Sequence, residues 1–315
     1  MSRPSSIPAP RVSIILPTYR RPESLARTLD GVLAQGAGFE WELIVIDNDD
    51  APGAEPVFRS REEAFGGRAR LVRETRRGSA HARNRGIEEV SGVVTAMLDD
   101  DVVPAPDWLE RITEPILAGR CSGAGGLVVL DPSVERPPWF DELAVGGYLA
   151  RWDLGHSERA LEAKEFILTA NCAFDTAKLR ATGGFEPTLG PRGKTPLVND
   201  DALLVRKVRE LGGSVRWVPG AVVFHELPPT RLNHRYLIKR AYAQGRSDWI
   251  LDRDTMADRK FGGVRIATSW LGQELGRRRK EGLRRPGVLF HLALDVVRTG
   301  GAMREAARQT FQKKG

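Results

Sequence analysis

Four short apolar runs, each followed by a helix-like pattern, dominate the first 130 residues of the chain. The runs lie at residues 12–16, 43–46, 70–74 and 93–98, and the run at 70–74 is the weakest. Continuous apolar character, without alternation, is typical of strands that are covered on both faces. Helices are expected to begin near Pro22, Ser79 and Pro106, because proline suits the first helical turn and serine caps it. The pattern predicts an α/β domain with a mostly parallel sheet flanked by helices.

The second half of the chain is less regular. Strands are predicted at residues 127–130, 166–174, 214–218 and 221–224, and a helix is predicted to begin at Asn199 or Asp200. The stretch 131–165 is rich in Pro, Gly and Trp and is expected to form loops that line a site. After Pro228 the pattern is helical to the end of the chain. We therefore divide the chain into a flexible leader (1–10), a domain (11–254) and a basic helical extension (255–315).

Positive charge is concentrated in that extension. The 315 residues carry a formal net charge of +7, but residues 255–315 alone hold 14 Lys and Arg against 5 Asp and Glu. The extension is therefore +9 and the remainder is −2, which argues against a nucleic-acid-binding body. An anionic membrane surface, or self-association through the amphipathic helix near the end, fits the extension better.

Other features of composition narrow the class of protein. A hydrophobic content of 41% is enough for a folded core. The two cysteines lack the spacing of a disulfide framework or zinc finger. There is no apolar run of about 18 residues, and the leader has no apolar core. We expect a cytoplasmic protein, or one at the inner face of the cell membrane.

Two acidic clusters directly follow predicted strands. Asp99, Asp100 and Asp101 come after the strand at 93–98, and the sequence DNDD at 47–50 follows the strand at 43–46. Ligands of open α/β sheets bind beyond the carboxyl ends of the strands, so both clusters are expected at one rim. Three adjacent carboxylates are favourable when a hard cation such as Mg²⁺ or Mn²⁺ neutralises them. The alternatives are a solvated acidic turn for the triplet, and turn chemistry rather than nucleobase or ribose binding for residues 47–50.

Three further positions carry polar groups suited to chemistry. Arg83 lies in a basic stretch, and its planar guanidinium suits a phosphate, although most of the stretch is expected to be solvated. Asp200 and Asp201 stand at a predicted helix start, where carboxylates either complement the helix dipole or supply a catalytic base. His225 ends a predicted strand and is either a metal or phosphate ligand or a satisfied, partly buried histidine.

Taken together, these segments resemble the family 2 glycosyltransferases of the GT-A fold. The resemblance runs from about residue 12 to residue 247, and its pieces keep the order and spacing of the family. They are VSIILPTYR at 12–20, ELIVID at 42–47, ARNRG at 82–86, LDDD at 98–101, TANCAF at 169–174, GGF at 183–185, NDD at 199–201 and VPGAVVFH at 218–225. The resemblance implies a Rossmann-like GT-A sheet with a nucleotide-binding half (11–130) and an acceptor half (131–254).

The resemblance also implies roles for individual residues. The nucleotide-sugar donor would be held by Pro17, Thr18, Tyr19, Asp47, Arg83, Asp99 and Asp100. A divalent cation would be held by Asp99 and Asp101, the outer residues of the family's DxD motif, and by His225. Asp200 matches the catalytic aspartate of the family's Glu-Asp pair, and Asp201 is a second candidate base. Asn199 departs from the family, because glutamate is usual at that position.

The implied activity is inverting transfer of a sugar from a nucleotide donor, with uridine as the expected base, to a hydroxyl of a saccharide or lipid-linked saccharide. Asp200 would act as general base, and the cation would stabilise the leaving diphosphate. Two alternatives remain open. A nucleotidyltransferase would need a glycine- and lysine-rich loop after the first strand, and residues 16–20 contain no glycine. A non-catalytic glycan- or partner-binding relative is the other, and Asn199 keeps it in consideration.

Overall fold

The computed structural model describes residues 10–51, 53–192, 195–256 and 288–312. Of the predicted leader, only its last residue falls within these ranges. The chain divides into two compact units. The first comprises Met1–Val129, Trp152–Thr188 and Asp200–Glu226, and the second comprises Leu130–Arg151, Leu189–Asn199 and Leu227–Gly315. Each unit is described here by itself.

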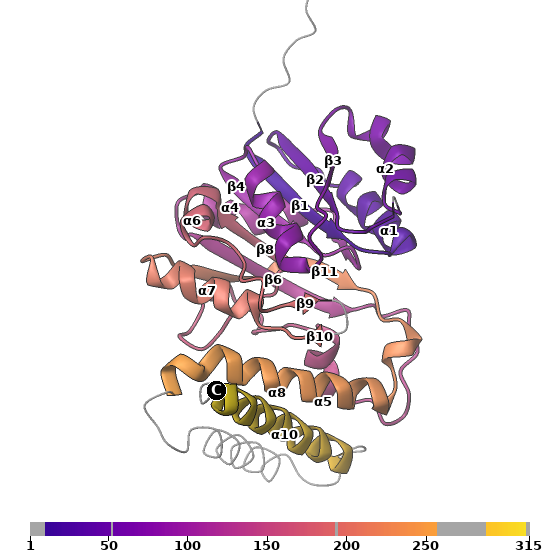
Figure 1. The fold of residues 1–315 in the computed structure, drawn as a ribbon. Coiled ribbons are helices and arrows are strands. Elements are labelled where there is room, and N and C mark those ends of the chain that lie inside the picture. The colour runs from indigo at the N-terminus through magenta and orange to yellow at the C-terminus, as the bar shows by residue number, and fades with distance from the viewer. Residues whose placement is uncertain (1–9, 52, 193–194, 257–287, 313–315) are drawn as a thin grey trace, which may run out of the picture. The chain divides into compact units, whose positions relative to one another are not determined.

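The first unit is built on one sheet, of which the structure describes nine strands. Its parallel part has the order β3-β2-β1-β4 (Figure 1). These strands are β1 (Val12–Thr18), β2 (Trp41–Asp47), β3 (Ala69–Arg73) and β4 (Val94–Leu98). All four were predicted from the apolar runs, and β1 pairs parallel with both β2 and β4.

The remaining strands make the sheet mixed rather than mostly parallel. They are β5 (Val102–Pro104), β6 (Gly123–Leu130), β7 (Arg159–Ala160), β8 (Asn171–Asp175) and β11 (Val215–His225). Strand β8 pairs antiparallel with both β4 and β6, and β11 pairs antiparallel with β5 and β7. A parallel neighbour needs a crossover connection, usually a helix, and the long loop-rich stretch before β8 does not supply one.

Several predicted boundaries need correction. The strand expected at 166–174 is confined to β8, and the two strands expected at 214–218 and 221–224 are the single strand β11, which passes through Pro219 and Gly220. An antiparallel pair tolerates the proline because β11 lacks a partner with an acceptor at every position. The helix expected from Pro106 begins two residues later.

Helices cover both faces of the sheet. They are α1 (Pro22–Leu33), α2 (Glu55–Glu62), α3 (Ser79–Glu89), α4 (Trp108–Leu117), α6 (Thr176–Ala181) and α7 (Asp200–Glu210). Helix α1 has proline at its first position and buries Leu25, Leu29 and Val32, which recur at helical spacing. Helices α2 and α6 and the short strand β5 were not predicted.

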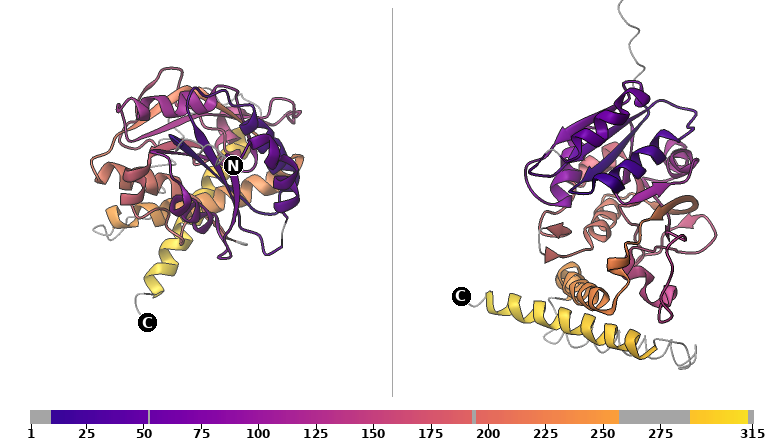
Figure 2. Two further views of the ribbon diagram at one scale, coloured as in Figure 1. Left: turned by 90° about the horizontal axis from the view of Figure 1, so that it is seen from above. Right: turned by 90° about the vertical axis from the view of Figure 1, so that its right-hand side faces the viewer.

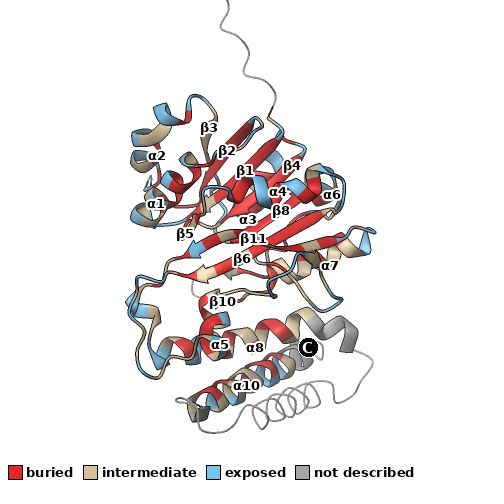
Figure 3. Cartoon of the chain, turned by 180° about the vertical axis from the view of Figure 1, so that it is seen from behind, coloured by how far each residue is buried: buried red, intermediate tan, exposed pale blue. Residues whose placement is uncertain are grey.

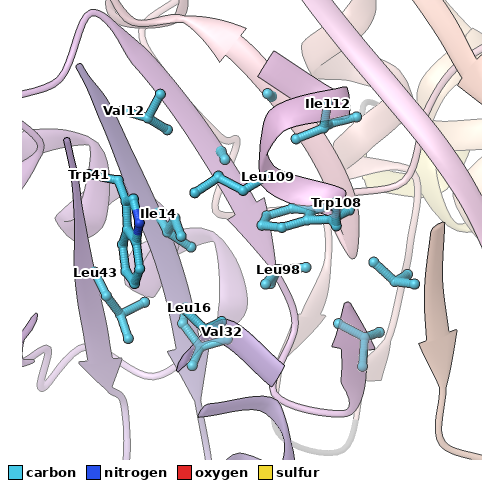
Figure 4. Packing of buried hydrophobic residues seen from close by; sticks show 14 of the residues in the cluster. Val12, Ile14, Leu16, Val32, Trp41, Leu43, Leu98, Trp108, Leu109 and Ile112 are labelled. Atoms are coloured by element: carbon cyan, nitrogen blue, oxygen red, sulfur yellow. The ribbon is translucent and has the colours of Figure 1, made fainter. Parts of the chain in front are cut away.

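The core lies on both faces of the central strands, which are buried along their length (Figure 3). Successive residues of β1 point to opposite faces, so Ile14 packs with Trp41 and Trp108 while Ile15 packs with Ile44. Figure 4 shows the first of these clusters, in which α4 covers the sheet with its apolar face. A sheet covered in this way exposes only its strand ends to a ligand, which places the candidate site.

The second unit is mainly helical. It contains α5 (Glu142–Val145), the short pair β9 (Pro191–Arg192) and β10 (Thr195–Pro196), α8 (His234–Met256) and α10 (Val288–Gln312). Helices α8 and α10 lie side by side (Figure 2). Its core combines residues of the three helices with neighbouring loops: Leu130, Val145, Leu149, Leu227, Leu237, Ala241 and Leu294. None of the described helices is both long and apolar enough to cross a membrane.

The predicted extension is helical where it is described, but its inner face is not the one that its apolar residues suggest. His291 is buried and Arg298 reaches α8, whereas Val296 is 58% exposed. The glycines explain this choice. A Cβ added to Gly245 would lie 1.7 Å from the carbonyl oxygen of Arg298, and one added to Gly301 would lie 2.2 Å from that of Tyr242. The helices touch through backbone at these points, which fixes the face of α10 that turns inward.

Candidate active site

The carboxyl ends of β1, β2 and β4 bring the predicted donor-binding residues together in the first unit. Thr18 is directly opposite Asp47 in the parallel pair of β1 and β2. Strand β4 ends at Leu98, so the acidic triplet begins at the same edge of the sheet. Thr18 donates a hydrogen bond from Oγ1 to Oδ2 of Asp100 at 2.8 Å. The convergence expected from the strand-end positions is therefore confirmed.

Asp100 points toward β1. Besides Thr18 it accepts hydrogen bonds from the backbone N–H of Tyr19 at 3.2 Å and from Nη1 of Arg21 at 3.0 Å. Burial raises the pKa of Asp100 to about 6, against the opposing charge of Arg21. Its contacts hold the segment after Pro17 in place. The ring of Tyr19 remains 39% exposed, which leaves a flat surface suited to stacking a base.

Asp101 faces two other groups. Nη1 of Arg21 lies 2.6 Å from its Oδ2, and Nε2 of His225 lies 3.5 Å from its Oδ1. The other ring nitrogen of His225, Nδ1, is 2.7 Å from the backbone carbonyl of Glu226, an acceptor only, so Nδ1 carries the proton. In the neutral ring the lone pair of Nε2 is then directed toward Asp101.

These atoms fit a divalent cation as a partial ligand set. Donors of Mg²⁺ or Mn²⁺ sit about 2 Å from the ion, so a carboxylate oxygen and an imidazole nitrogen 3.5 Å apart are close enough to share one. A carbonyl holding the opposite ring nitrogen is the usual support of a histidine ligand. Within the described residues, no three His, Cys, Asp or Glu side chains form a complete metal cluster. The protein set is therefore open to further oxygen ligands.

Glu226 explains why His225 reaches the triplet. Strand β11 pairs with β5, and His225 lies opposite Val102, the residue after Asp101. The backbone N–H of Glu226 donates to the carbonyl of Asp101 at 2.9 Å, while its carboxylate accepts from Ser24 and Arg27 of α1 at 2.6 Å each. The end of β11 is thereby tied both to the triplet and to α1.

Arg83 joins two carboxylates that are far apart in the sequence. Nη2 donates to Oδ1 of Asp99 at 2.6 Å, and Nη1 donates to Oδ2 of Asp200 at 3.1 Å. The guanidinium is 6% exposed and raises its own pKa through these charges, although burial opposes the shift. The next residue, Asn84, exchanges hydrogen bonds with the backbone of Phe185, which places the GGF segment beside α3.

Asp200 is the first residue of α7 and is buried. Burial raises its pKa, and the charge of Asp99 adds to the shift while Arg83 opposes it. Asp201 accepts a hydrogen bond from the backbone N–H of Ala202. Desolvation, with the charge of Asp200, raises the pKa of Asp201 to about 7. Two carboxyl groups with raised pKa values at a helix start, one of them joined to Asp99, match the sites where proteins keep a base.

The second acidic cluster divides between structure and surface. Asp47 is buried and its pKa is raised mainly by that burial, while Oδ1 accepts the backbone N–H of Asp49. Asn48 is a structural residue, since its amide binds the carbonyls of Glu74 and Arg76 and the N–H of Gly78. It thereby fixes the loop that leads into α3. The predicted turn beyond Asp50 is present, because the N–H of Gly53 donates to the carbonyl of Ala51.

Sequence reasoning missed three residues of this region: Arg21, Asn48 and Glu226. Arg21 was passed over because it stands next to the helix-starting proline, although a basic residue facing three carboxylates is what the charge balance requires. Asn48 was grouped with the acidic residues around it. Glu226 follows the last residue of the motif that carried the resemblance, and no local signal marks it.

Comparison with known proteins identifies the fold and the family. A mannosyltransferase from Pyrobaculum calidifontis, PcManGT, solved in complex with GDP-Man and Mn²⁺, matches with a TM-score of 0.62. The match covers 96% of this chain and 90% of that one at 19% identity, so the protein has the GT-A fold. The family model "Glycosyl transferase family 2" matches residues 13–180. The chain belongs to this family of glycosyltransferases.

Individual relatives are more distant. The glucosyl-dolichyl phosphate glucuronosyltransferase of Haloferax volcanii is 28% identical over 253 residues, which is 77% of each chain. The succinoglycan biosynthesis protein ExoM of Rhizobium meliloti is 26% identical over 232 residues, covering 73% of this chain and 71% of the relative.

Proposed function

We propose that the protein transfers a sugar from a nucleotide-sugar donor to a hydroxyl group with inversion, and that Asp200 is the general base. The observation that carries the proposal is the bridge made by Arg83 between Asp99 and Asp200. Asp99 belongs to the acidic triplet at the end of β4, and Asp200 begins α7. The bridge puts a candidate base and a candidate donor-binding residue on the same guanidinium.

The surroundings of Asp200 suit proton removal from an alcohol. Its raised pKa makes it a better proton acceptor than an exposed aspartate. A positioned general base of this kind contributes about 10²–10⁴-fold to a rate. In a single displacement, Asp200 takes the proton of the acceptor hydroxyl as its oxygen bonds to the anomeric carbon. The bond from that carbon to the diphosphate breaks on the opposite face, which inverts the centre.

We assign the cation to Asp99, Asp101 and His225, with Mg²⁺ or Mn²⁺ as the ion. When bound, such an ion neutralises the charge that develops on the leaving diphosphate. The Mn²⁺ in the mannosyltransferase neighbour supports a divalent cation. The DxD assignment of Asp99 and Asp101 follows from their position at the end of β4 and from the pair formed by Asp101 and His225.

The donor side is assigned to Pro17, Thr18, Tyr19, Asp47 and Asp100, at the ends of β1, β2 and β4. Asp100 acts by holding Thr18 and Tyr19, and the exposed ring of Tyr19 offers a stacking surface. Uridine is the base that the family resemblance favours. The neighbour solved with GDP-Man makes a guanosine donor the first competitor to include in a test.

The acceptor is proposed to be a saccharide or a lipid-linked saccharide, as the names of the relatives acting on dolichyl phosphate sugars and in succinoglycan biosynthesis suggest. A lipid-linked acceptor would place the enzyme at the cytoplasmic face of the membrane. The basic extension would then supply the attraction to anionic lipid. Flotation with anionic and with neutral vesicles at low salt tests this; equal recovery in both fractions would remove the membrane contact.

The central experiment compares Asp200→Asn with Asp201→Asn, a matched loss of one carboxylate in the same helical turn. Wild-type protein is incubated with UDP- and GDP-sugars and Mn²⁺, and sugar transfer or slow donor hydrolysis is measured. Asp200→Asn is expected to lose at least about 100-fold in rate while donor binding changes little. Asp201→Asn is expected to keep most activity. An equally active Asp200→Asn variant would remove Asp200 from the role.

The same assay separates the alternative functions. A nucleotidyltransferase would release pyrophosphate from a nucleoside triphosphate and a sugar phosphate. A binding protein would show a donor-dependent rise in melting temperature without turnover, because a ligand of the folded state alone raises apparent stability.

A further inference from the structure

Asn199, the residue where the family usually has glutamate, adopts an unusual backbone conformation. Its φ angle is +77°, in the left-handed region that asparagine tolerates better than most residues with a side chain. It directly precedes Asp200, the first residue of α7. Whatever holds Asn199 in this conformation also fixes the direction in which α7 begins.

The side chain of Asn199 is held by a closed set of hydrogen bonds within the second unit. Nδ2 donates to Oδ1 of Asp248 at 2.9 Å, and Oδ1 accepts from Nε2 of Gln244 at 2.9 Å. Gln244 also donates to the same oxygen of Asp248 at 2.9 Å. Asn199 is 6% exposed and Asp248 is 8% exposed, so little water competes for these groups. The residue before Asn199 is fixed too, because the N–H of Val198 donates to Oγ of Ser247 at 2.9 Å.

The extension completes this arrangement. Arg298 of α10 donates from Nε to the other oxygen of Asp248, Oδ2, at 2.8 Å, and its Nη2 lies at the same distance. The backbone contact at Gly245 brings Arg298 to this point, three residues before Asp248 on α8. Asp248 thus stays an ionised acceptor although it is buried, because a guanidinium on the neighbouring helix compensates its charge.

We propose that Asn199, Gln244, Asp248 and Arg298 form a clamp that positions Asp200, so that the C-terminal helix supports catalysis without touching substrate. The inference rests on the proposed function of Asp200. It also accounts for the departure from the family at position 199. A glutamate there would direct a second carboxylate at Asp248, whereas the amide of Asn199 supplies both the donor for Asp248 and the acceptor for Gln244.

The test exchanges the two groups that meet. Asn199→Asp places a carboxylate against Asp248, and the double variant Asn199→Asp with Asp248→Asn restores one amide and one carboxylate with the roles reversed. We expect the single variant to lose about 10- to 100-fold in kcat with donor KM changed less than about 3-fold. The double variant is expected to recover at least about 10-fold of that loss, as coupling between contacting residues requires.

A second measurement does not depend on turnover. Hydrogen exchange of the backbone amides at residues 202–204 is expected to accelerate about 10-fold in Asn199→Asp and to recover in the double variant, because the clamp holds the start of α7. Arg298→Ala is expected to behave like Asn199→Asp. Arg304→Ala, an exposed arginine on the same helix, serves as its control.

The outcomes distinguish the clamp from the catalytic proposal. Unchanged kcat and unchanged exchange in Asn199→Asp would overturn the clamp while leaving Asp200 as base. Loss of melting temperature with kcat unaltered would also overturn it, because the network would then be structural only. If wild-type protein shows no transfer and Asp200→Asn binds donor as well as wild type, the proposed function fails, and the exchange result alone decides whether the clamp holds α7.

Discussion

Arg83 and Asp200 lie 117 positions apart in the sequence and form a buried ion pair, with Nη1 3.1 Å from Oδ2. Arg83 comes from the middle of α3 and Asp200 from the first turn of α7. The same guanidinium binds Asp99 at 2.6 Å, at the end of β4. Three elements of the first unit thus meet at one side chain, and the planar fork of arginine is what allows two carboxylates to be held at once.

Arg83→Met is expected to destabilise the fold by about 3–5 kcal/mol, because Asp200 would be left buried without its compensating charge. Denaturant unfolding measures the change. Arg85→Met is the matched control two residues along α3, since Arg85 is 38% exposed and pairs with Glu89 at 2.5 Å on the surface. Exposed pairs are worth about 0–1 kcal/mol. Equal losses in the two variants would contradict a special role for the buried bridge.

Removing the proposed cation ligand should abolish the effect of the metal. Mn²⁺ with a nucleoside diphosphate is expected to raise the melting temperature of wild-type protein, and chelation should reverse the rise. In Asp101→Asn the Mn²⁺-dependent part of the shift should disappear. Asp107→Asn, at an exposed carboxylate that pairs only with Arg111 among its printed contacts, should retain it. A shift that persists with chelator present would count against a cation site at the triplet.

Glu305 makes the stability of the second unit dependent on pH. Burial opposes its charged form, but Arg246 at 2.9 Å and Arg308 hold its pKa below the ordinary 4.5. A carboxyl group with a lowered pKa in the folded state stabilises above its unfolded pKa, and that stability is lost as pH falls through the folded value. Glu305→Gln should cost about 1.5–3 kcal/mol at pH 7.

The difference between Glu305→Gln and wild type should shrink as pH falls below about 4.5, where the unfolded state takes up the proton. Thermal unfolding between pH 7 and pH 3 follows it. Glu210→Gln, at a side chain that is 65% exposed, should show a small effect at every pH. A penalty that stays constant down to pH 3 would mean that Glu305 acts through packing rather than charge.

Two glycines on the helix pair should respond in opposite directions to alanine. At Gly245 the added Cβ would lie 1.7 Å from a carbonyl oxygen of α10, so Gly245→Ala must separate the helices and should cost about 1–3 kcal/mol or more. At Gly300 nothing lies within 4 Å of an added Cβ. Gly300→Ala should therefore stabilise α10 by about 0.5–1 kcal/mol through helix propensity. Urea unfolding midpoints compare them, and destabilisation by both substitutions would refute the packing argument.

The sequence determined the elements whose signals are local. The apolar runs of β1, β2 and β4 and the helical spacing of Leu25, Leu29 and Val32 were sufficient to place the parallel half of the sheet. The strand ends then located Thr18, Asp47 and the acidic triplet at one edge, since parallel strands end on the same side. The resemblance carried by the ordered motifs supplied the family, which the family model confirms.

The tertiary structure decided what depends on pairing between distant segments. The antiparallel placement of β8 and β11, the approach of His225 to Asp101, and the inward turn of the polar face of α10 have no local signature. Each follows from backbone hydrogen bonds or close contacts across many residues, and these bonds choose among partners that the local sequence leaves equivalent. Asn199 illustrates the division: its identity is visible in the sequence, but Asp248, Gln244 and Arg298 give it its role.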